Sequence, residues 1–284
     1  MSRRREQRPD DGARAAPSAR YDLPPERLAT AGDRLLPSFV IIGAQKGGTS
    51  SLYHYLSSHP DTAPAFTKEV HFFNRWHRRG IDWYRAFFPL ASEAEIAGEA
   101  SPNYLAHPAS ARRLADALPD AKVIVLLRNP VERAYSQYWM QRRRGHEARS
   151  FEVAIDDAAI DRLNHDGNLR ADWNRSAYRS RGLYAEHLEP WLEAVAPDNL
   201  LILRSEDFFA DPADILARAQ RFVGMRPWQP EHFDVKQDGG DYEPIDPDTR
   251  ARLAEWYEPH NRRLYDLIGR DMGWERDDPS DPGR

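Results

Sequence analysis

The fold is decided by residues 39–51, which read FVIIGAQKGGTSS. Residues 39–42 form a continuous apolar run, which is typical of a strand covered on both faces of a parallel sheet. Residues 50–58 carry apolar side chains at helical spacing, so a glycine-rich turn joins a strand to a helix. The N-terminus of such a helix presents backbone N–H groups and a partial positive charge. The stretch therefore predicts an anion-binding loop.

This loop differs from a Walker A motif, which reads GxxxxGK[ST]. Gly43 and Gly48 fit the motif, but Thr49 occupies the lysine position and Lys46 lies earlier in the loop. A lysine within the loop can approach the bridging oxygen of a phosphate ester rather than the terminal phosphates of a triphosphate. We therefore favour a phosphate-ester site, and an ordinary strand-to-helix turn is the alternative.

Two further apolar runs, Lys122–Leu127 and Leu200–Leu203, predict buried strands. Helical spacing or a first-turn proline predicts helices over residues 109–118, from 130 through 138 and beyond, 184–194, 212–222 and 248–268. This alternation predicts an α/β fold, a P-loop-like open parallel sheet flanked by helices in a single domain. Ligands of such sheets bind at the carboxyl ends of the strands.

The two ends of the chain differ in composition from its middle. Residues 1–36 mix Arg, Asp, Pro and Ala without hydrophobic periodicity, so we expect a disordered N-terminal arm there. Residues 275–284 have a similar composition and predict a flexible tail. Since no internal repeat or low-complexity linker interrupts residues 37–274, we expect one domain over that range.

The composition excludes several classes of protein. The 284 residues contain no cysteine, which excludes disulfides, thiol catalysis and thiolate zinc sites. No apolar run approaches the roughly 20 residues that span a bilayer, and no signal-type apolar stretch follows the first arginines. We therefore expect a cytoplasmic protein without a membrane span. Only four of the 40 basic residues are lysines and the net charge is -5, so the arginines do not indicate a nucleic-acid partner.

A second anion site is predicted where the strand at residues 122–127 ends. P-loop NTPases usually carry a magnesium-binding acid there, whereas this chain has Arg128. A guanidinium followed by a hydroxyl at Ser136 suits a second phosphate. We expect Arg133 and Arg142–Arg144 to lie on solvated helix faces. Two phosphate sites without a metal-binding carboxylate fit a nucleotide with 5′ and 3′ phosphates, as in 3′-phosphoadenosine 5′-phosphosulfate (PAPS).

At this point the sequence resembles the PAPS-dependent sulfotransferases, specifically the branch of heparan sulfate N- and 3-O-sulfotransferases and their bacterial relatives. The resemblance runs from about Pro37 to Trp274. Its motifs, in chain order, are QKGGTSS at 45–51, KEVHFF at 68–73, GIDWY at 80–84, EASPNY at 99–104, residues 128–136, and GLY at 182–184. The ordered set is far more specific than any one motif.

The resemblance implies a role for each candidate site residue. It implies that Glu69 is the general base, that His71 lies nearby as a second proton carrier or an orienting group, and that Arg128 and Ser136 hold the 3′-phosphate. The residues that would cradle the 5′-phosphosulfate are Lys46, Gly47, Gly48, Thr49, Ser50 and Ser51. Lys46 would also stabilise the leaving phosphate. No metal is expected to take part. Without the resemblance, residues 68–71 would be interpreted as a polar turn.

The acceptor is less constrained than the donor. Heparan 3-O-sulfotransferases carry an acid where this chain has Asn74 and a substrate-contacting lysine where it has Ala100. These departures favour a hydroxyl or amine of a smaller acceptor, such as a carbohydrate, glycolipid or secondary metabolite, over a sulfated polysaccharide. Lys236, in the loop at 235–240, is a candidate nucleotide contact. The alternatives are a P-loop kinase or NTPase, and a non-enzymatic nucleotide- or RNA-binding regulator.

Overall fold

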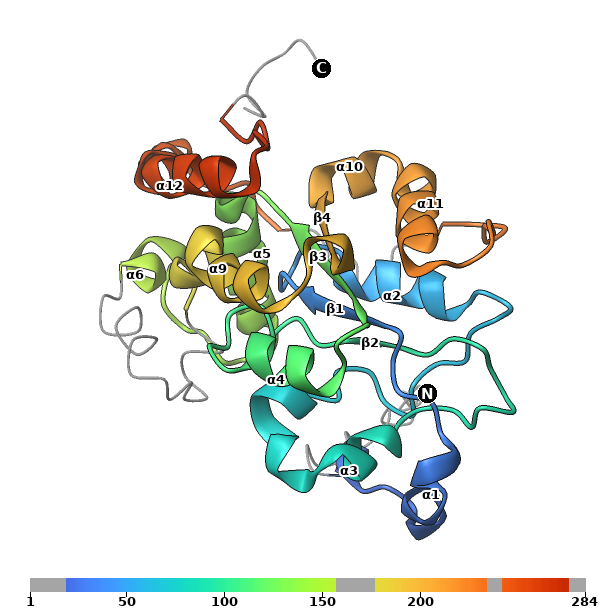
Figure 1. Cartoon of the computed structure of the whole chain (residues 1–284). Helices are drawn as coiled ribbons and strands as arrows, with labels where there is room; N and C mark the ends of the chain where they lie inside the picture. The colour runs from blue at the N-terminus through green and yellow to red at the C-terminus, as the bar shows by residue number, and fades with distance from the viewer. Residues whose placement is uncertain (1–18, 157–176, 234–241, 276–284) are drawn as a thin grey trace, which may run out of the picture.

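The computed structural model describes residues 19–156, 177–233 and 242–275. Within these ranges, four parallel strands form one sheet with the order β2-β1-β3-β4 (Figure 1). The strands are β1 (Phe39–Gly43), β2 (Gly98–Ala100), β3 (Lys122–Leu127) and β4 (Leu200–Arg204). The structure confirms the predicted α/β fold and the three strands expected from apolar runs.

Helices cover both faces of this sheet (Figure 1). One layer contains α2 (Thr49–Ser57), α10 (Ser205–Ala210) and α11 (Pro212–Val223). The other contains α3 (Ile81–Arg85), α4 (Ser110–Ala117), α9 (Tyr184–Ala194) and part of α12 (Pro247–Ile268). Along β1, Val40 and Ile42 pack in the second layer, whereas Phe39 and Ile41 pack in the first. Each fully buried side chain of this kind contributes about 1.5–3 kcal/mol, which explains the continuous apolar runs.

The long helices begin where capping side chains and prolines start them. Asn129 accepts a hydrogen bond from the Val131 N–H and opens α5 (Pro130–Arg143), with a proline at its first position. Asp246 accepts from the Thr249 N–H at the start of α12. The remaining elements are η1 (Ala19–Tyr21), α1 (Pro25–Ala29), η2 (Ala31–Asp33), η3 (Phe72–Trp76), η4 (His77–Arg79), α6 (Phe151–Ile155), η5 (Ser180–Gly182) and η6 (Pro197–Asn199).

Strand β2 has no counterpart in the predicted set. Its three residues place Glu99 between Gly98 and Ala100, so it lacks the apolar run that marked the other strands. Gly98 is required because a Cβ there would lie 2.0 Å from the ring of Phe39. The strand is held by backbone pairing with β1 rather than by its own hydrophobic pattern.

The predicted disordered arm is wrong for residues 19–36. Arg27 Nε donates to the Ala86 carbonyl (2.7 Å), and Arg34 Nη1 donates to the Phe88 carbonyl (2.8 Å). Tyr21 belongs to the main hydrophobic core. The segment shows no hydrophobic periodicity because a few long side chains anchor it. It has no regular apolar face that would produce such a pattern. At the other end of the domain, Glu275 accepts hydrogen bonds from two residues of α12.

The expectation for Arg133 is also wrong, since its side chain is 0% exposed. Its Nη1 donates to Gln137 Oε1 (2.6 Å), and its Nη2 donates to the Tyr178 carbonyl. A buried guanidinium is tolerated when its N–H groups find acceptors, as Nη1 and Nη2 do here, although the buried Nε has no hydrogen-bond partner. Arg142–Arg144 are exposed as expected.

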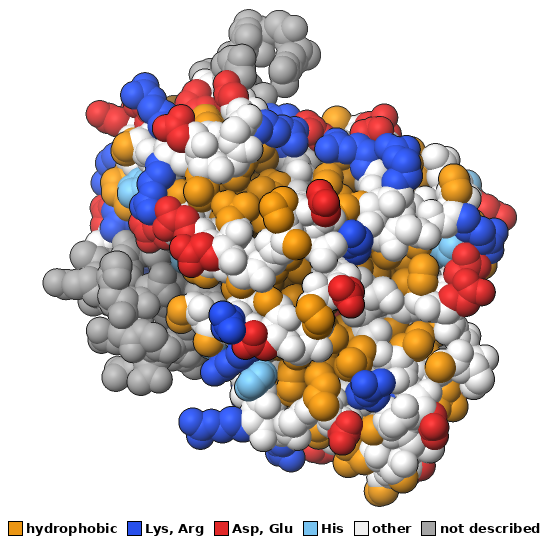
Figure 2. Space-filling model, viewed as in Figure 1, with side chains coloured by type: hydrophobic (Ala, Val, Ile, Leu, Met, Phe, Trp, Pro, Cys, Tyr) orange, Lys and Arg blue, Asp and Glu red, His pale blue; other side chains and the backbone are white. Residues whose placement is uncertain are grey.

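The molecular surface mixes charges of both signs. On the face shown in Figure 2, basic and acidic side chains are interspersed among apolar ones rather than gathered in a single patch. In the part of the chain that the structure describes, no helix is both long and apolar enough to cross a bilayer.

Candidate active site

The carboxyl ends of the four strands bring the candidate residues together. We call residues 43–51, which follow β1 and enter α2, the glycine loop. Arg128 follows β3, and its Nη1 donates to the Lys46 carbonyl (3.1 Å). Ser205 follows β4, and its Oγ donates to the Gly47 carbonyl (2.9 Å). Ser101 follows β2. The sheet edge predicted to hold the ligand therefore contains the glycine loop and three further polar residues.

The glycine loop is a cradle whose close packing leaves no room for side chains at Gly47 and Gly48. A Cβ on Gly47 would lie 2.8 Å from the Leu126 carbonyl oxygen. Gly48 has φ of +89° and caps α2, and a Cβ there would lie 3.0 Å from the Phe208 ring. Because α2 begins at Thr49, its first N–H groups point out of the helix toward this cradle. The geometry fits a phosphate or phosphosulfate group.

Lys46 and Arg128 supply the positive charge of the loop. Burial, with a smaller contribution from the Arg128 charge, lowers the pKa of Lys46 to about 8. A bound anion would reverse this shift, because it favours the protonated amine. The Arg128 guanidinium also lies 5.5 Å from the centre of the Phe209 ring, which is exposed. Since the Arg128 charge acts on the Lys46 amine, the two cations belong to one electrostatic site.

The predicted hydroxyl residues occupy different depths. Thr49 and Ser51 are buried in the first turn of α2, whereas Ser50 is partly exposed. Ser136 is 3% exposed and lies about two turns into α5. The structure joins Arg128 to the glycine loop by a hydrogen bond, and it places Ser136 on the helix that follows Arg128.

The second part of the site is residues 68–71, which we call the carboxylate turn. Glu69 Oε2 lies 3.4 Å from His71 Nε2, and Glu69 Oε1 lies 3.7 Å from Lys68 Nζ. Lys68 Nζ also donates to Ser50 Oγ of the glycine loop. The structure thus brings Glu69 and His71 to the N-terminus of α2. Lys68 is the first residue of the KEVHFF motif, but the sequence analysis does not predict it as a site residue.

The electrostatic surroundings keep Glu69 ionised. Burial alone would raise its pKa, but the hydrogen bond and charge of His71, with the charges of Lys68 and Arg20, lower the pKa of Glu69 to about 2. The side chain keeps one third of its surface exposed. It is therefore an accessible carboxylate at neutral pH, and His71 serves as its nearest partner.

A buried polar cluster lies beneath the carboxylate turn. Glu99 is 1% exposed and accepts hydrogen bonds from the hydroxyls of Tyr84, Ser101 and Tyr104. Burial raises the pKa of Glu99, while these hydrogen bonds act in the opposite direction. Ser101 Oγ also accepts from the His71 backbone N–H (3.1 Å). The cluster therefore supports the backbone of the turn from below.

Arg181 is a site residue that the sequence analysis missed. It is 5% exposed, and it donates to Gln45 Oε1 (2.6 Å) and to Asn103 Oδ1 (2.5 Å). Burial and the charge of Arg133 lower the pKa of Arg181 to about 9, while the charge of Glu69 acts in the opposite direction. The guanidinium links the glycine loop to the segment after β2. Arg181 directly precedes the GLY motif at residues 182–184 and is not part of it.

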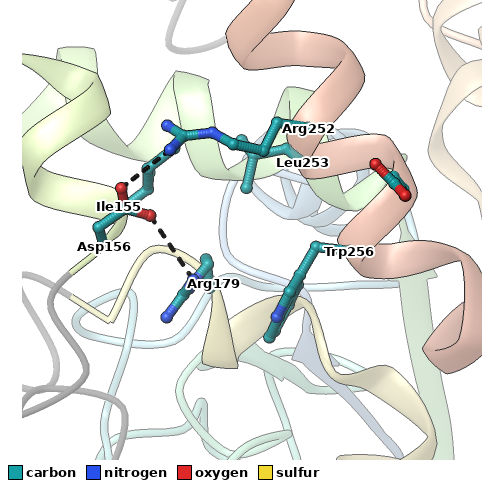
Figure 3. Close-up of a pocket in the computed structure, with 7 residues that line it drawn as sticks. Ile155, Asp156, Arg179, Arg252, Leu253 and Trp256 are labelled. Atoms are coloured by element: carbon teal, nitrogen blue, oxygen red, sulfur yellow. Dashed lines mark hydrogen bonds and ion pairs between the residues drawn. The ribbon is translucent and has the colours of Figure 1, made fainter.

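A separate pocket of about 430 Å³ lies between α6, η5 and α12 (Figure 3). Asp156 Oδ2 accepts from Arg252 Nη1 (3.0 Å), and Asp156 Oδ1 lies 3.8 Å from Arg179 Nη1. The Arg179 guanidinium lies 4.9 Å from the centre of the Trp256 ring. Because Asp156 pairs with both Arg179 and Arg252, we do not assign this pocket to the site.

Three sequence expectations about the acceptor and nucleotide meet different outcomes. Ala100 is fully buried in β2 and packs in the helix layer that contains α2. Asn74 is partly buried in η3. Lys236 lies outside the described residues.

Comparison with known proteins decides the family. A family model described as the sulfotransferase domain matches residues 36–236. The chain belongs to the sulfotransferase family. This sulfotransferase is similar to heparan sulfate glucosamine 3-O-sulfotransferase 3A1 of Mus musculus, with 32% identity over 271 residues. The aligned region covers 87% of this chain and 67% of that protein.

Two other proteins are similar to this sulfotransferase. The bifunctional heparan sulfate N-deacetylase/N-sulfotransferase 3 of Homo sapiens is 34% identical over 270 residues, which cover 82% of this chain and 30% of that protein. The crystal structure of a sulfotransferase from Alicyclobacillus acidocaldarius superposes with a TM-score of 0.70 at 32% identity and covers 85% of this chain and 100% of that one. The protein is therefore a transferase with the sulfotransferase fold.

Proposed function

We propose that this sulfotransferase moves the sulfuryl group of PAPS to a hydroxyl or amine of a carbohydrate acceptor. The observation that carries the proposal is the contact of Lys68 with both parts of the site. Its Nζ donates to Ser50 of the glycine loop and lies 3.7 Å from the Glu69 carboxylate. A base beside the anion cradle is the arrangement that group transfer from a phosphate-bound donor needs.

The glycine loop would bind the 5′-phosphosulfate end of the donor. Its N–H groups at the start of α2 and the Lys46 amine would balance the negative charge that accumulates on the leaving phosphate oxygen. Arg128, with Ser136, would bind the 3′-phosphate through a charge-assisted contact. Gly47 and Gly48 let the loop pack closely on the Leu126 carbonyl and the Phe208 ring, where a Cβ at either position would collide.

Glu69 would accept the proton of the acceptor group during attack on sulfur. The acceptor O–H or N–H bond breaks, a bond from that O or N to sulfur forms, and the bond from sulfur to the 5′-phosphate oxygen breaks. The products are the sulfated acceptor and adenosine 3′,5′-bisphosphate, and the proton stays on Glu69. His71, whose Nε2 lies 3.4 Å from Glu69 Oε2, would orient the carboxylate and stabilise its negative charge before the transfer.

The similar proteins support a carbohydrate acceptor. One is named as a 3-O-sulfotransferase of heparan sulfate glucosamine and another as a heparan sulfate N-deacetylase/N-sulfotransferase, which suggests an amino sugar and leaves oxygen or nitrogen open. Asn74 and Ala100, where heparan 3-O-sulfotransferases carry an acid and a lysine, favour a smaller acceptor. Polymer and small glycoside are therefore both included in the test.

The experiment incubates the full chain with sulfur-35-labelled PAPS and three acceptors: heparosan, its de-N-acetylated form, and p-nitrophenyl glucosaminide. Labelled product in at least one arm, absent with Glu69→Gln, is the expected result. Label in the first two arms alone would select a polymer, and label in the third alone a small glycoside. Absence of label in all three, with a metabolite extract also unlabelled, would contradict the proposal.

A further inference from the structure

The segment ahead of β1 reaches the active site although it lies upstream of the family match, which begins at residue 36. We call residues 19–35 the N-terminal segment. Arg27 and Arg34 fasten it to the carbonyls of residues 86 and 88, as described above. The Leu35 N–H donates to the Pro89 carbonyl (3.0 Å). These anchors fix the segment without any contribution from the site itself.

Tyr21, at the start of this segment, contacts the carboxylate turn directly. Its hydroxyl donates to the backbone carbonyl of Glu69 (3.0 Å). Its ring packs against Trp76 (centroids 5.6 Å apart) and Phe87 (6.5 Å), and only 7% of the residue is exposed. The hydroxyl is therefore held at a fixed place relative to Glu69.

The turn needs such support because of its backbone. Glu69 has φ of +61° and His71 has φ of +57°, in the left-handed region that side chains disfavour. Residues persist there when surrounding contacts fix them. Ser101 accepts from the His71 N–H on one side (3.1 Å), and Tyr21 donates to the Glu69 carbonyl on the other. The two contacts hold the backbone on either side of Val70.

Arg20 adds a charge to the same contact. Its guanidinium lies 4.7 Å from the centre of the Tyr21 ring and donates to the Tyr21 hydroxyl. Among the described residues, the titratable and charged groups that act on Glu69 are Lys68, His71, Arg20, Arg181 and Tyr21. Arg20 and Tyr21 both come from the N-terminal segment.

We propose that Tyr21 is a positioning residue for Glu69, and that the N-terminal segment is a working part of the active site. The relevance to catalysis rests on the proposed role of Glu69 as the base. The positioning itself does not rest on that role, since it concerns only the backbone and the charge state of the carboxylate turn.

The test uses the full chain with Tyr21→Phe, which keeps the ring and removes only the hydroxyl. Tyr138→Phe is the matched control, because Tyr138 is also buried and its hydroxyl donates to the Arg149 carbonyl (3.0 Å) away from the turn. Amide hydrogen exchange of residues 69–72 should accelerate about 3- to 10-fold in Tyr21→Phe, as expected for the loss of one hydrogen bond. Tyr138→Phe should leave it unchanged.

A second measurement follows the Glu69 carboxyl carbon by NMR titration, with Glu69→Gln for assignment. Tyr21→Phe should raise the pKa of Glu69, since it releases Arg20 from the hydroxyl that holds it. Arg20→Gln, which leaves Tyr21 intact, should raise it in the same direction. Tyr138→Phe should not move it.

Unchanged exchange of residues 69–72 in Tyr21→Phe would overturn the proposal, whatever Arg20→Gln does. A uniform acceleration over the whole chain would also overturn it, because Tyr21 would then contribute only to overall stability. Neither measurement uses an acceptor or sulfuryl transfer. A failure here therefore differs from a failure of the proposed function, which would appear as an active Glu69→Gln variant or an absence of labelled product.

Discussion

The glycine loop and the carboxylate turn solve the same backbone problem in different ways. The loop places glycine at one left-handed position, Gly48, where a Cβ would meet the Phe208 ring. Lys46 of the loop is also left-handed, with φ of +72°, and its carbonyl accepts from Arg128. The turn places Glu69 and His71 in that region without any glycine and relies on contacts from distant parts of the chain. The donor side of the site is therefore specified by local sequence to a greater extent than the base side. Changes in the first should alter nucleotide binding, and changes in the second should alter turnover.

Glu69→Gln tests this division with the largest expected effect. Loss of the base should lower kcat by roughly 100-fold or more, the usual contribution of general base catalysis. Affinity for adenosine 3′,5′-bisphosphate should be unchanged, because the proposed nucleotide site consists of the glycine loop and Arg128. Initial rates and calorimetric titration measure the two quantities. Near-normal turnover would move the role of base to His71 or another group.

Arg128→Ala should affect the opposite quantity. Removal of a charge-assisted contact costs about 1.5–3 kcal/mol, so affinity for adenosine 3′,5′-bisphosphate should fall about 10- to 100-fold. Affinity for adenosine 5′-phosphate, which lacks the 3′-phosphate, should change much less. Arg262→Ala, at an exposed position on α12, is the control. Equal losses for both nucleotides would place Arg128 on the 5′ side of the site.

Gly47→Ala tests the close packing of the glycine loop through its effect on the stability of the protein. Its Cβ would lie 2.8 Å from the Leu126 carbonyl oxygen, which is backbone and cannot move aside. Overpacking of this kind lowers the free energy of unfolding by about 1–3 kcal/mol. Gly32→Ala is a matched control, since a Cβ at that position meets nothing within 4 Å. Thermal and urea melts would show whether the two variants differ.

The pH dependence of nucleotide binding should follow Lys46. Its pKa is lowered to about 8, so the amine is protonated below that pH and loses its charge above it. Phosphate binding favours the protonated amine, so affinity should be steady below pH 8 and fall by up to about tenfold per pH unit above it. Calorimetry in buffers of different ionisation enthalpy should detect proton uptake near pH 8. Lys46→Arg should abolish the dependence, and an equal fall in that variant would refute the assignment.

Chelation of divalent metal has the smallest expected effect. Since we expect no metal in the proposed transfer, activity after treatment with EDTA should equal that of untreated enzyme. Restoration of a lost activity by Mg²⁺, but not by monovalent salt, would show that the donor side needs more than the glycine loop and its cations.

Local sequence predicted the backbone of the glycine loop for a physical reason. Residues 39–51 contain the strand, the turn and the helix start in one continuous stretch, which the apolar pattern and the glycines mark. Arg128 stood out because it follows a buried strand, whose carboxyl end always lies at the ligand edge of such a sheet. The bounds of α9 and β3 were also predicted from local pattern, namely helical spacing over residues 184–194 and an apolar run over residues 122–127.

The supporting residues could not be predicted because each acts across long sequence separations. Arg181 reaches Gln45 and Asn103, and Tyr21 reaches Glu69, without any periodic pattern that marks them. Arg133 appeared to be one more arginine on a helix, and only packing shows that it is buried. Glu69 itself was found through a family resemblance, since its turn has no local signal.

The most direct test of the central claim is one calorimetric comparison on the full chain. Adenosine 3′,5′-bisphosphate in the presence of EDTA is titrated in parallel with ATP in the presence of Mg²⁺. The account predicts tight binding of the bisphosphate, equal in the protein and in Glu69→Gln, and weak or no binding of ATP. Tight binding of ATP with Mg²⁺, and none of the bisphosphate, would contradict it.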